Sequence, residues 1–375
     1  LLVSIAAMIT TLPQFIFTGI DMTLSWLWQG LEALASLTWS QVFVGWLPIE
    51  GFVSTFIVGC LCLVMRRWHW PVLILLMPLV GFLIFKTYGD NFSKNQANNN
   101  SQVVVTLLDV GQGLSVWVRQ GERNMLYDVG NHYRSGFNLV DAVILPELLA
   151  QGVNQIDVLA ISHWDMDHSG GLHPLLQQKV VRRLILPSES KPKREKGLVT
   201  SAIDVSRCAS TSWENLWKDF SIQPSIQTST QPNTQLMWRQ IALADYGLSG
   251  NDASCVILLN LFWRQVLIAG DIEAKAESVL VELAGKSDGV SLVSDVLIAP
   301  HHGSKTSSTK EFLNQVMPAY VLISAGRINS YGHPHKSITG AYWGYGSHWY
   351  NTGRHGQIRV IIEADGDYRI IPYLP

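Results

Sequence analysis

Cysteine is scarce in this chain, which has four cysteines among its 375 residues. Cys60 and Cys62 fall in an apolar run, where they are most simply small packing residues. Cys208 and Cys255 lie in the more polar part of the chain, where an oxidising compartment would permit a disulfide. Sequence does not show whether their Cα atoms come within bridging distance, so their pairing stays open at this point.

Charged side chains are nearly absent from residues 1–86, which hold three acidic residues, three basic residues and six of the fourteen tryptophans. Residues 1–20, 51–65 and 71–85 form three apolar runs, each at or below the roughly 20 residues that a membrane-spanning helix needs. We therefore predict that residues 1–86 form transmembrane helices at the end of a larger membrane domain. The charged residues of this region are Asp21, Glu32, Glu50, Arg66, Arg67 and Lys86.

The orientation of this region follows from Arg66 and Arg67, which lie between the second and third apolar runs and which the positive-inside rule assigns to the cytoplasm. The third run then leads out of the cytoplasm into a predicted polar linker, residues 87–102. Because the chain has no initiator Met, we expect it to be the C-terminal part of a longer protein. Residues 103–375 are predicted to form a globular domain on the periplasmic or extracellular side of a bacterial inner membrane.

An excess of basic residues is also lacking. When three charges of each sign are subtracted from the totals of 27 Lys and Arg and 29 Asp and Glu, 24 basic and 26 acidic residues remain for residues 87–375. No overall basic field therefore indicates nucleic-acid binding.

Short β-rich segments in residues 103–375 come first in hairpins and are then interleaved with helices, which predicts an α/β (α+β) sandwich with four αββα layers. The predicted strands are residues 103–109, 114–118, 124–128, 158–161, 183–186, 256–261, 266–269, 296–299 and 320–324. The predicted helices are residues 139–151, 171–179, 212–220, 274–284 and 309–316.

A dense group of potential metal ligands follows the predicted strand 158–161, in the pattern H-x-D-x-D-H. Imidazoles and carboxylates crowded at one strand end would repel one another or lie desolvated unless a divalent cation balanced them. Alternate residues of a loop project to one side, so His163 and Asp165 can share a first metal. Asp167 and His168 then turn with the chain toward a second. The pattern predicts a two-metal hydrolase site.

Further ligands must come from other strand ends. Asp271 follows the predicted strand 266–269, where it is well placed to bridge two metals, although an Asp there can also cap the next helix. His301 and His302 follow the strand 296–299, and adjacent histidines point in divergent directions. One of them could bind metal or protonate a leaving group while the other packs, and the sequence does not say which.

Four more residues have two interpretations each. His333 and His335 could complete the metal shell or orient a phosphate, or they are surface histidines in a Pro-Gly loop. Asp109 and Asp128 each close a strand before a glycine turn, where they could hydrogen-bond metal-bound histidines. Simple turn formation is the rival interpretation, stronger for Asp109. Because the donors are oxygen and nitrogen without a thiolate, the two divalent ions are predicted to be Zn²⁺ or Mn²⁺.

Taken together, these residues resemble the metallo-β-lactamase superfamily, and more narrowly the C-terminal domain of ComEC-type competence proteins, which are inner-membrane channels that take up transforming DNA. The motifs that carry the resemblance are Asp109-Val110-Gly111-Gln112-Gly113, Asp128-Val129-Gly130, the run from Ser162 to Gly171, Ala269-Gly270-Asp271-Ile272-Glu273, and the run from Pro300 to Ser307.

The resemblance implies a part of a DNA-uptake channel whose external domain is a metal-dependent phosphodiesterase, or nuclease, that cleaves DNA. The implied partners are single-stranded DNA, the membrane, the N-terminal part of the same channel, other competence proteins and, in a homo-oligomer, further copies of the chain. The resemblance implies metal ligands at His163, Asp165, Asp167, His168, Asp271 and His302, catalytic roles for Asp167, His301 and His302, and supporting or substrate contacts from Asp109, Asp128, Ser304, Lys305, His333 and His335.

The chain also departs from the superfamily pattern. Asp165 stands at the usual second His, a change that ComEC-type proteins share. Leu114 follows the Gly-Gln-Gly where many members have an acidic residue. No His lies between His173 and Asp271 to act as the superfamily's third-motif ligand. Two other functions therefore stay open: a membrane-anchored hydrolase of a phospholipid or a lactam, and a non-catalytic domain that guides DNA.

Overall fold

The computed structural model describes residues 102–197, 203–212, 214–216, 236–286 and 290–374, together with Met22, Ser25, Trp26, Trp28 and Gln29. The membrane helices predicted within residues 1–86 and the linker 87–102 therefore lie almost entirely outside the described residues. Within the described part of the chain, no helix has both the length and the apolar character to cross a bilayer.

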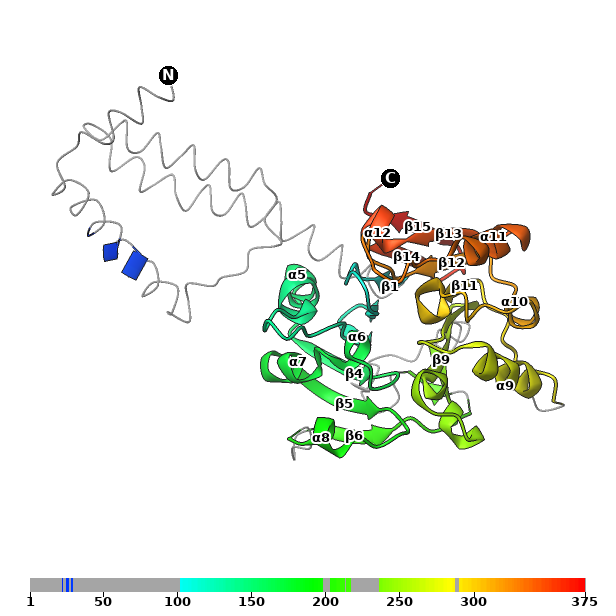
Figure 1. Ribbon diagram of the computed structural model, residues 1–375, viewed down its shortest axis with the longest axis horizontal. Helices are drawn as coiled ribbons and strands as arrows, with labels where there is room; N and C mark the ends of the chain where they lie inside the picture. The colour runs from blue at the N-terminus through cyan, green and yellow to red at the C-terminus, as the bar shows by residue number, and fades with distance from the viewer. Residues whose placement is uncertain are drawn as a thin grey trace, which may run out of the picture. The chain divides into compact units, whose positions relative to one another are not determined.

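Two β-sheets form the centre of the described domain (Figure 1). The larger one has eight strands in the order β15-β14-β1-β2-β3-β4-β5-β6 within the described ranges. Its strands are β1 (Gln102–Leu107), β2 (Val116–Gln120), β3 (Arg123–Tyr127), β4 (Gln155–Ala160), β5 (Val180–Leu186), β6 (Asp204–Arg207), β14 (Ile358–Glu363) and β15 (Tyr368–Pro372).

The second sheet has seven strands in the order β13-β12-β11-β10-β9-β8-β7, again counting described residues. Its strands are β7 (Glu214–Asn215), β8 (Met237–Ala242), β9 (Cys255–Leu261), β10 (Arg264–Ile268), β11 (Val296–Ile298), β12 (Tyr320–Ile323) and β13 (His348–Asn351).

Each sheet is antiparallel on one side and parallel on the other. Strands β3 to β6 run parallel in the first sheet, and strands β10 to β13 run parallel in the second. Parallel neighbours need crossover connections, and helices supply many of them. The helical segments are η1 (Val140–Ile144), α5 (Leu145–Ala150), α6 (Met166–Ser169), α7 (Leu172–Gln178), α8 (Pro192–Glu195), η3 (Leu243–Tyr246), η4 (Gly250–Ala253), α9 (Ala274–Ala284), η5 (Pro300–Gly303), α10 (Lys310–Val316), α11 (Lys336–Gly344) and α12 (Thr352–His355).

Alternation along the strands divides the core into three layers of apolar side chains. In β2, Val116 and Val118 pack between the sheets, whereas Trp117 faces the helices that cover the first sheet. In β9, Ile257 faces the other sheet and Leu258 faces the helices of the second. Helices α5 and α7 contribute to one outer layer and α9, α10 and α11 to the other (Figure 1). The predicted αββα sandwich is therefore confirmed for the described domain.

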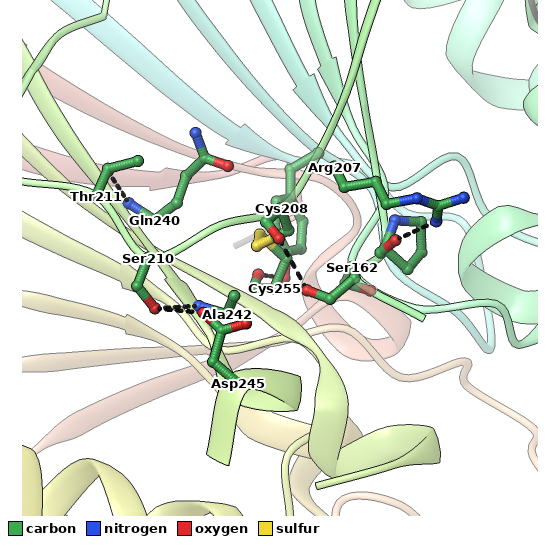
Figure 2. Close-up of a disulfide and its surroundings, with 12 residues drawn as sticks. Ser162, Arg207, Cys208, Ser210, Thr211, Gln240, Ala242, Asp245 and Cys255 are labelled. Atoms are coloured by element: carbon green, nitrogen blue, oxygen red, sulfur yellow. Dashed lines mark hydrogen bonds between the residues drawn. A yellow bond between two sulfur atoms is a disulfide. The ribbon is translucent and has the colours of Figure 1, made fainter. Parts of the chain in front are cut away.

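A disulfide joins the two sheets (Figure 2). Cys208 follows β6 of the first sheet, Cys255 begins β9 of the second, and their Cα atoms are 5.9 Å apart. The amide of Cys255 donates a hydrogen bond of 2.9 Å to the carbonyl of Ser162, in the loop that carries the metal-ligand motif. The pairing that the sequence left open is thus present, and it lies beside the strand ends where the candidate ligands gather.

The structure corrects one predicted element. Residues 212–220 were expected to form a helix, but Glu214 and Asn215 form strand β7, which pairs with Met237 and Trp238 of β8. Burial of Leu216 and Trp238 in the layer between the sheets explains the change, because the second sheet gains an edge strand there. Residues 217–220 lie outside the described part of the chain.

Candidate metal centre

The metal-ligand motif lies in the loop that leaves β4 and in the short helix α6. His163 is buried in the loop and Asp165 is exposed before α6, which carries Asp167 and His168. A Cβ atom on Gly170 would lie 2.3 Å from a carbonyl of the same turn and 2.5 Å from the amide of His132. Glycine is required there because the loop packs directly against the backbone that follows β3.

His168 is held from behind by Asp128. Both side chains are fully buried, and Nδ1 of His168 lies 2.8 Å from Oδ2 of Asp128. The same carboxylate accepts hydrogen bonds of 2.7 Å from the amide and from the hydroxyl of Ser162. A carboxylate at Nδ1 fixes the ring and its tautomer, so Nε2 of His168 is left to face the site.

His302 and His163 are oriented in the same way. Nδ1 of His302 lies 2.9 Å from the carbonyl oxygen of Ser324, directly after β12. Nδ1 of His163 lies 2.9 Å from the hydroxyl of Ser162 and 3.4 Å from that of Ser254. In all three histidines the support lies at Nδ1, and Nε2 is the nitrogen available to a ligand.

Asp271 stands where these nitrogens converge. Its Oδ2 is 3.1 Å from Nε2 of His168 and 3.4 Å from Nε2 of His302, and those two nitrogens are 3.3 Å apart. Asp167 adds an oxygen 3.6 Å from Nε2 of His302. Donor atoms of Asp167, His168, Asp271 and His302 all lie within 4.8 Å of one another, which is the geometry of a group that could hold a metal ion.

Three further donor atoms belong to Asp271 and to the loop that carries His163. Nε2 of His163 and Oδ1 of Asp271 are both buried, and neither has a hydrogen-bond partner. Oδ2 of Asp165 is 3.9 Å from Nε2 of His163, and this side chain is half exposed. Buried polar atoms without partners are costly, so each of these two atoms is suited to bind a cation.

The electrostatics of the cluster reflect the same crowding. Burial would lower the pKa of His168, yet the charges of Asp271 and Asp128 raise it well above its usual value. Burial would also lower the pKa of His302, but the charge of Asp271 raises it to about 9. Burial would raise the pKa of Asp271, but the charges of His168 and His302 lower it well below its usual value. Protons on two imidazoles thus balance the carboxylates, and a bound cation would replace them.

His163 behaves differently from the other two histidines. Burial holds its pKa down at about 3, and the charge of His168 adds to the effect. A neutral imidazole with an unpartnered Nε2 is the form in which histidine binds metal.

His301 lies at the rim of the cluster and is partly exposed. Its Nδ1 is 3.0 Å from a carboxylate oxygen of Glu273, and its Nε2 is 3.9 Å from Oδ2 of Asp271. His301 and His302 have φ values of 47° and 56°, and Gly303 follows at 76°. Consecutive non-glycine residues in the left-handed region are strained, and such strain is typical of functional sites. The turn sends His302 into the cluster and His301 to its rim.

The remaining predicted residues divide between the site and its surroundings. His333 belongs to the site, because its ring stacks on that of His302 with centroids 6.3 Å apart. His335 is exposed and caps helix α11 through Ser337. Asp109 accepts a hydrogen bond from Gly111 within its own turn, as the rival interpretation expected.

Ser304 and Lys305 follow the strained turn of η5. Ser304 is buried and its hydroxyl lies 3.0 Å from that of Thr306, whereas Lys305 is exposed beside it. The structure therefore gives Ser304 a supporting role within the turn and leaves the Lys305 ammonium group in solvent.

Sequence reasoning missed three serines that support the site. Ser162 joins Asp128 to His163, Ser324 orients His302, and the hydroxyl of Ser254 accepts a hydrogen bond of 3.1 Å from the amide of Asp271. Each of these serines lies next to the end of a strand, as the candidate metal ligands do. This shared position is the one feature of the sequence that could have indicated them.

This fold and this cluster define a class of protein. Residues 108–327 match the model of the metallo-beta-lactamase superfamily, and the chain belongs to that superfamily.

Among curated relatives, the chain is 33% identical over 262 residues to Recombination protein 2 of Haemophilus influenzae, covering 70% of this chain and 29% of the relative. It is 30% identical over 297 residues to Competence protein ComA of Neisseria gonorrhoeae, covering 79% of this chain and 36% of the relative. The chain thus spans about a third of the length of these two relatives, and the predicted resemblance to competence proteins is confirmed. Among solved structures, a mutant of the CmlA beta-hydroxylase aligns with a TM-score of 0.42 and 13% identity over 70% of this chain and 54% of that one.

Proposed function

We propose that the described domain is a metal-dependent phosphodiesterase that cleaves DNA, and that it belongs to a competence-type DNA-uptake protein. The observation that carries the proposal is the position of Asp271, whose Oδ2 meets His168 and His302 while its buried Oδ1 and Nε2 of His163 lack partners. Such a carboxylate is suited to bridge two cations, for which Zn²⁺ and Mn²⁺ are the candidates.

The protein residues have separate tasks in this proposal. His168, His302, Asp167 and one oxygen of Asp271 would hold one ion, while His163, Asp165 and the other oxygen would hold the second. Bound divalent ions would lower the pKa of a water molecule and neutralise charge on a phosphodiester.

His301 is the residue suited to proton transfer. Glu273 holds its Nδ1, and its Nε2 lies 3.9 Å from Oδ2 of Asp271 on a partly exposed side chain, from which it would give a proton to the departing oxygen. The exposed fraction of the Asp167 side chain, 27%, indicates that solvent reaches the cluster at this residue.

The proposal also includes the setting of the domain. Residues 1–86 would be transmembrane helices of a bacterial inner-membrane channel, and the hydrolase would lie on the periplasmic or extracellular side. Its partners would be single-stranded DNA, the remainder of the channel, other competence proteins and further copies of the chain. The names of the relatives support this setting.

The test is cleavage of single-stranded DNA by the purified 375-residue chain in detergent, followed on a gel with Mn²⁺ or Zn²⁺ added. We expect cleavage by the parent chain and its loss in Asp167→Ala. The matched control is Asp204→Ala, an exposed carboxylate of β6 that pairs with Arg183. Equal rates for the parent and Asp167→Ala would end the nuclease proposal.

Two results would support the rival functions. Hydrolysis of phospholipid or lactam without cleavage of DNA would support a membrane-anchored hydrolase of another substrate. Metal-dependent binding of DNA with no hydrolysis of any of these substrates would support a non-catalytic guiding domain.

A further inference from the structure

Three aromatic rings lead from the protein surface into the metal centre. The ring of Tyr331 stacks on that of His333 with centroids 5.7 Å apart and planes 27° apart. The ring of His333 stacks in turn on that of His302, at 6.3 Å and 26°. We call these residues, Tyr331, His333 and His302, the ring stack. Its inner ring is buried among the metal ligands, while Tyr331 is 69% exposed.

The loop that carries Tyr331 is fixed on both sides. The side chain of Asn329 accepts a hydrogen bond from the amide of His333 and donates one to its carbonyl, at 2.9 and 2.8 Å. The amide of His335 donates a hydrogen bond of 2.9 Å to the carbonyl of Gly303, in the strained turn beside His302. A Cβ atom on Gly303 would lie 2.8 Å from Pro334, so loop and turn are in direct contact. Tyr331 is therefore an exposed ring on a braced loop.

A single exposed aromatic ring is common on a protein surface, so the inference depends on what surrounds this one. Two exposed cations belong to the segments that carry the ring stack: Arg327 at the start of this loop, and Lys305 directly after the turn of His302. An aromatic platform beside exposed cations, next to a phosphodiester site, is the combination that binds single-stranded nucleic acid by base stacking and charge. An apolar lipid chain would not use the stacked geometry or the cations.

We propose that Tyr331, backed by His333, stacks on a nucleobase of the strand being cleaved and so positions the neighbouring phosphodiester at the metal centre. This inference rests on the proposed phosphodiesterase function and names a positioning residue for it. Stacking on a ring face tolerates all four bases, so the platform would give preference for unpaired strands without preference for sequence.

The experiment measures binding apart from cleavage. The 375-residue chain, kept free of metal with EDTA, is titrated into two fluorescent oligonucleotides of equal length, one of thymidines and one of abasic sugar-phosphate units. We expect the parent chain to bind the thymidine strand more tightly by about 5- to 150-fold, the range for one stacked base. Tyr331→Ala should remove most of this difference, and Tyr331→Phe should keep it.

Trp263→Ala is the matched control, because Trp263 is 70% exposed but lies in the turn between β9 and β10, at the sheet edge opposite Asp271. It should bind both strands like the parent. With metal restored, Tyr331→Ala should raise KM for single-stranded DNA, whereas Trp263→Ala should keep the parent's KM for DNA and the parent's kcat for the small diester bis(p-nitrophenyl) phosphate.

Equal affinity of the parent chain for the two strands, or an unchanged difference in Tyr331→Ala, would overturn the platform. A parent chain that prefers the thymidine strand through Tyr331 but hydrolyses neither DNA nor the small diester would keep the platform and reject the phosphodiesterase. The two failures are therefore distinguishable.

Discussion

The two sheets resemble each other at the amino ends of their parallel strands and differ at the carboxyl ends, where the candidate metal ligands lie. At the amino ends of their parallel pairs, Asp157 accepts a hydrogen bond from the amide of Asn124, and Asp295 accepts one from the amide of Gln265, both of 2.9 Å. An arginine donates to the second side-chain oxygen in each case. At the carboxyl ends the sheets differ, because an aspartate follows β3 in one sheet and β10 in the other, with different surroundings.

Asp128, after β3, is fully buried and uses its oxygens on Ser162 and His168. Asp271, after β10, has one oxygen among the imidazoles and a buried oxygen without a partner. The difference teaches that a strand-end aspartate is suited to support a histidine when hydrogen-bond donors surround it, and is suited to bind a cation when one of its buried oxygens has no donor. Residue type alone does not separate the two roles.

The largest expected effect comes from removing the ligand. Asp271→Asn should abolish tight binding of Mn²⁺ or Zn²⁺ and lower the rate of DNA cleavage by about three orders of magnitude, because the charge between the two donor sets is lost. Metal content after dialysis and gel-based rates check this. Retention of the parent's metal content would contradict the role of Asp271.

Removing Asp128, which holds His168, should lower metal affinity less than removing Asp271 does. In Asp128→Asn, an amide NH₂ would face Nδ1 of His168, which would place the ring proton on Nε2, the nitrogen that faces the cluster. We expect metal affinity to fall about 10- to 100-fold, the range for second-layer partners of metal-bound histidine. Isothermal titration of both variants gives the comparison. A larger loss in Asp128→Asn than in Asp271→Asn would reverse the assigned roles.

The disulfide that joins the two sheets should affect the stability of the fold rather than the affinity for metal. Reduction of the Cys208–Cys255 disulfide, or its replacement by two alanines, should lower the free energy of unfolding by about 2–4 kcal/mol. Urea unfolding with and without dithiothreitol measures the change, and the double alanine variant should not respond to the reductant. An unchanged midpoint on reduction would show that the bridge adds no stability.

The matching hydrogen bonds of Asp157 and Asp295 predict two smaller losses of stability, which should be unequal. Asp157→Ala should destabilise the fold by about 1–3 kcal/mol, because it leaves the buried amide of Asn124 without its acceptor. Asp295→Ala should cost less, since water can reach the 24% exposed side chain that is removed there. Urea midpoints test the order, and metal content should stay at the parent's value in both.

The last expected effect is a gradual dependence of metal affinity on pH. His302, with its pKa raised to about 9, and His168 hold protons that a cation must displace. Metal affinity should therefore rise with pH by about tenfold per unit for each proton displaced, and the slope should decrease above about pH 9, where His302 has lost its proton. Titrations at several pH values check the slope. An affinity that fell as pH rose would contradict the proton competition.

The grouping of candidate ligands could be predicted in part from sequence because these residues follow strand ends in short motifs. His163, Asp165, Asp167 and His168 lie within six residues, and Asp271 closes a recognisable apolar strand. The pattern could not separate His301 from His302, because their divergence depends on left-handed backbone angles that the sequence does not display.

Contacts between segments that lie far apart in the chain could not be predicted from the sequence either. Ser324 holds His302, yet its own hydroxyl donates to the carbonyl of Gly113, 211 residues away. Helix α11 was missed because Lys336–Gly344 contains two glycines and few strong helix formers, and packing of Ile338 and Tyr342 stabilises it instead. Strand β7 was predicted as helix for the same reason, since tertiary packing overrides local preference.

The most direct test of the account is anomalous diffraction from crystals of the chain grown with Mn²⁺. Two anomalous peaks are expected, one at the Oδ2 of Asp271 beside His168 and His302, and one at its Oδ1 beside His163. A single peak, or peaks that do not contact Asp271, would contradict the claim that this carboxylate joins two metal positions.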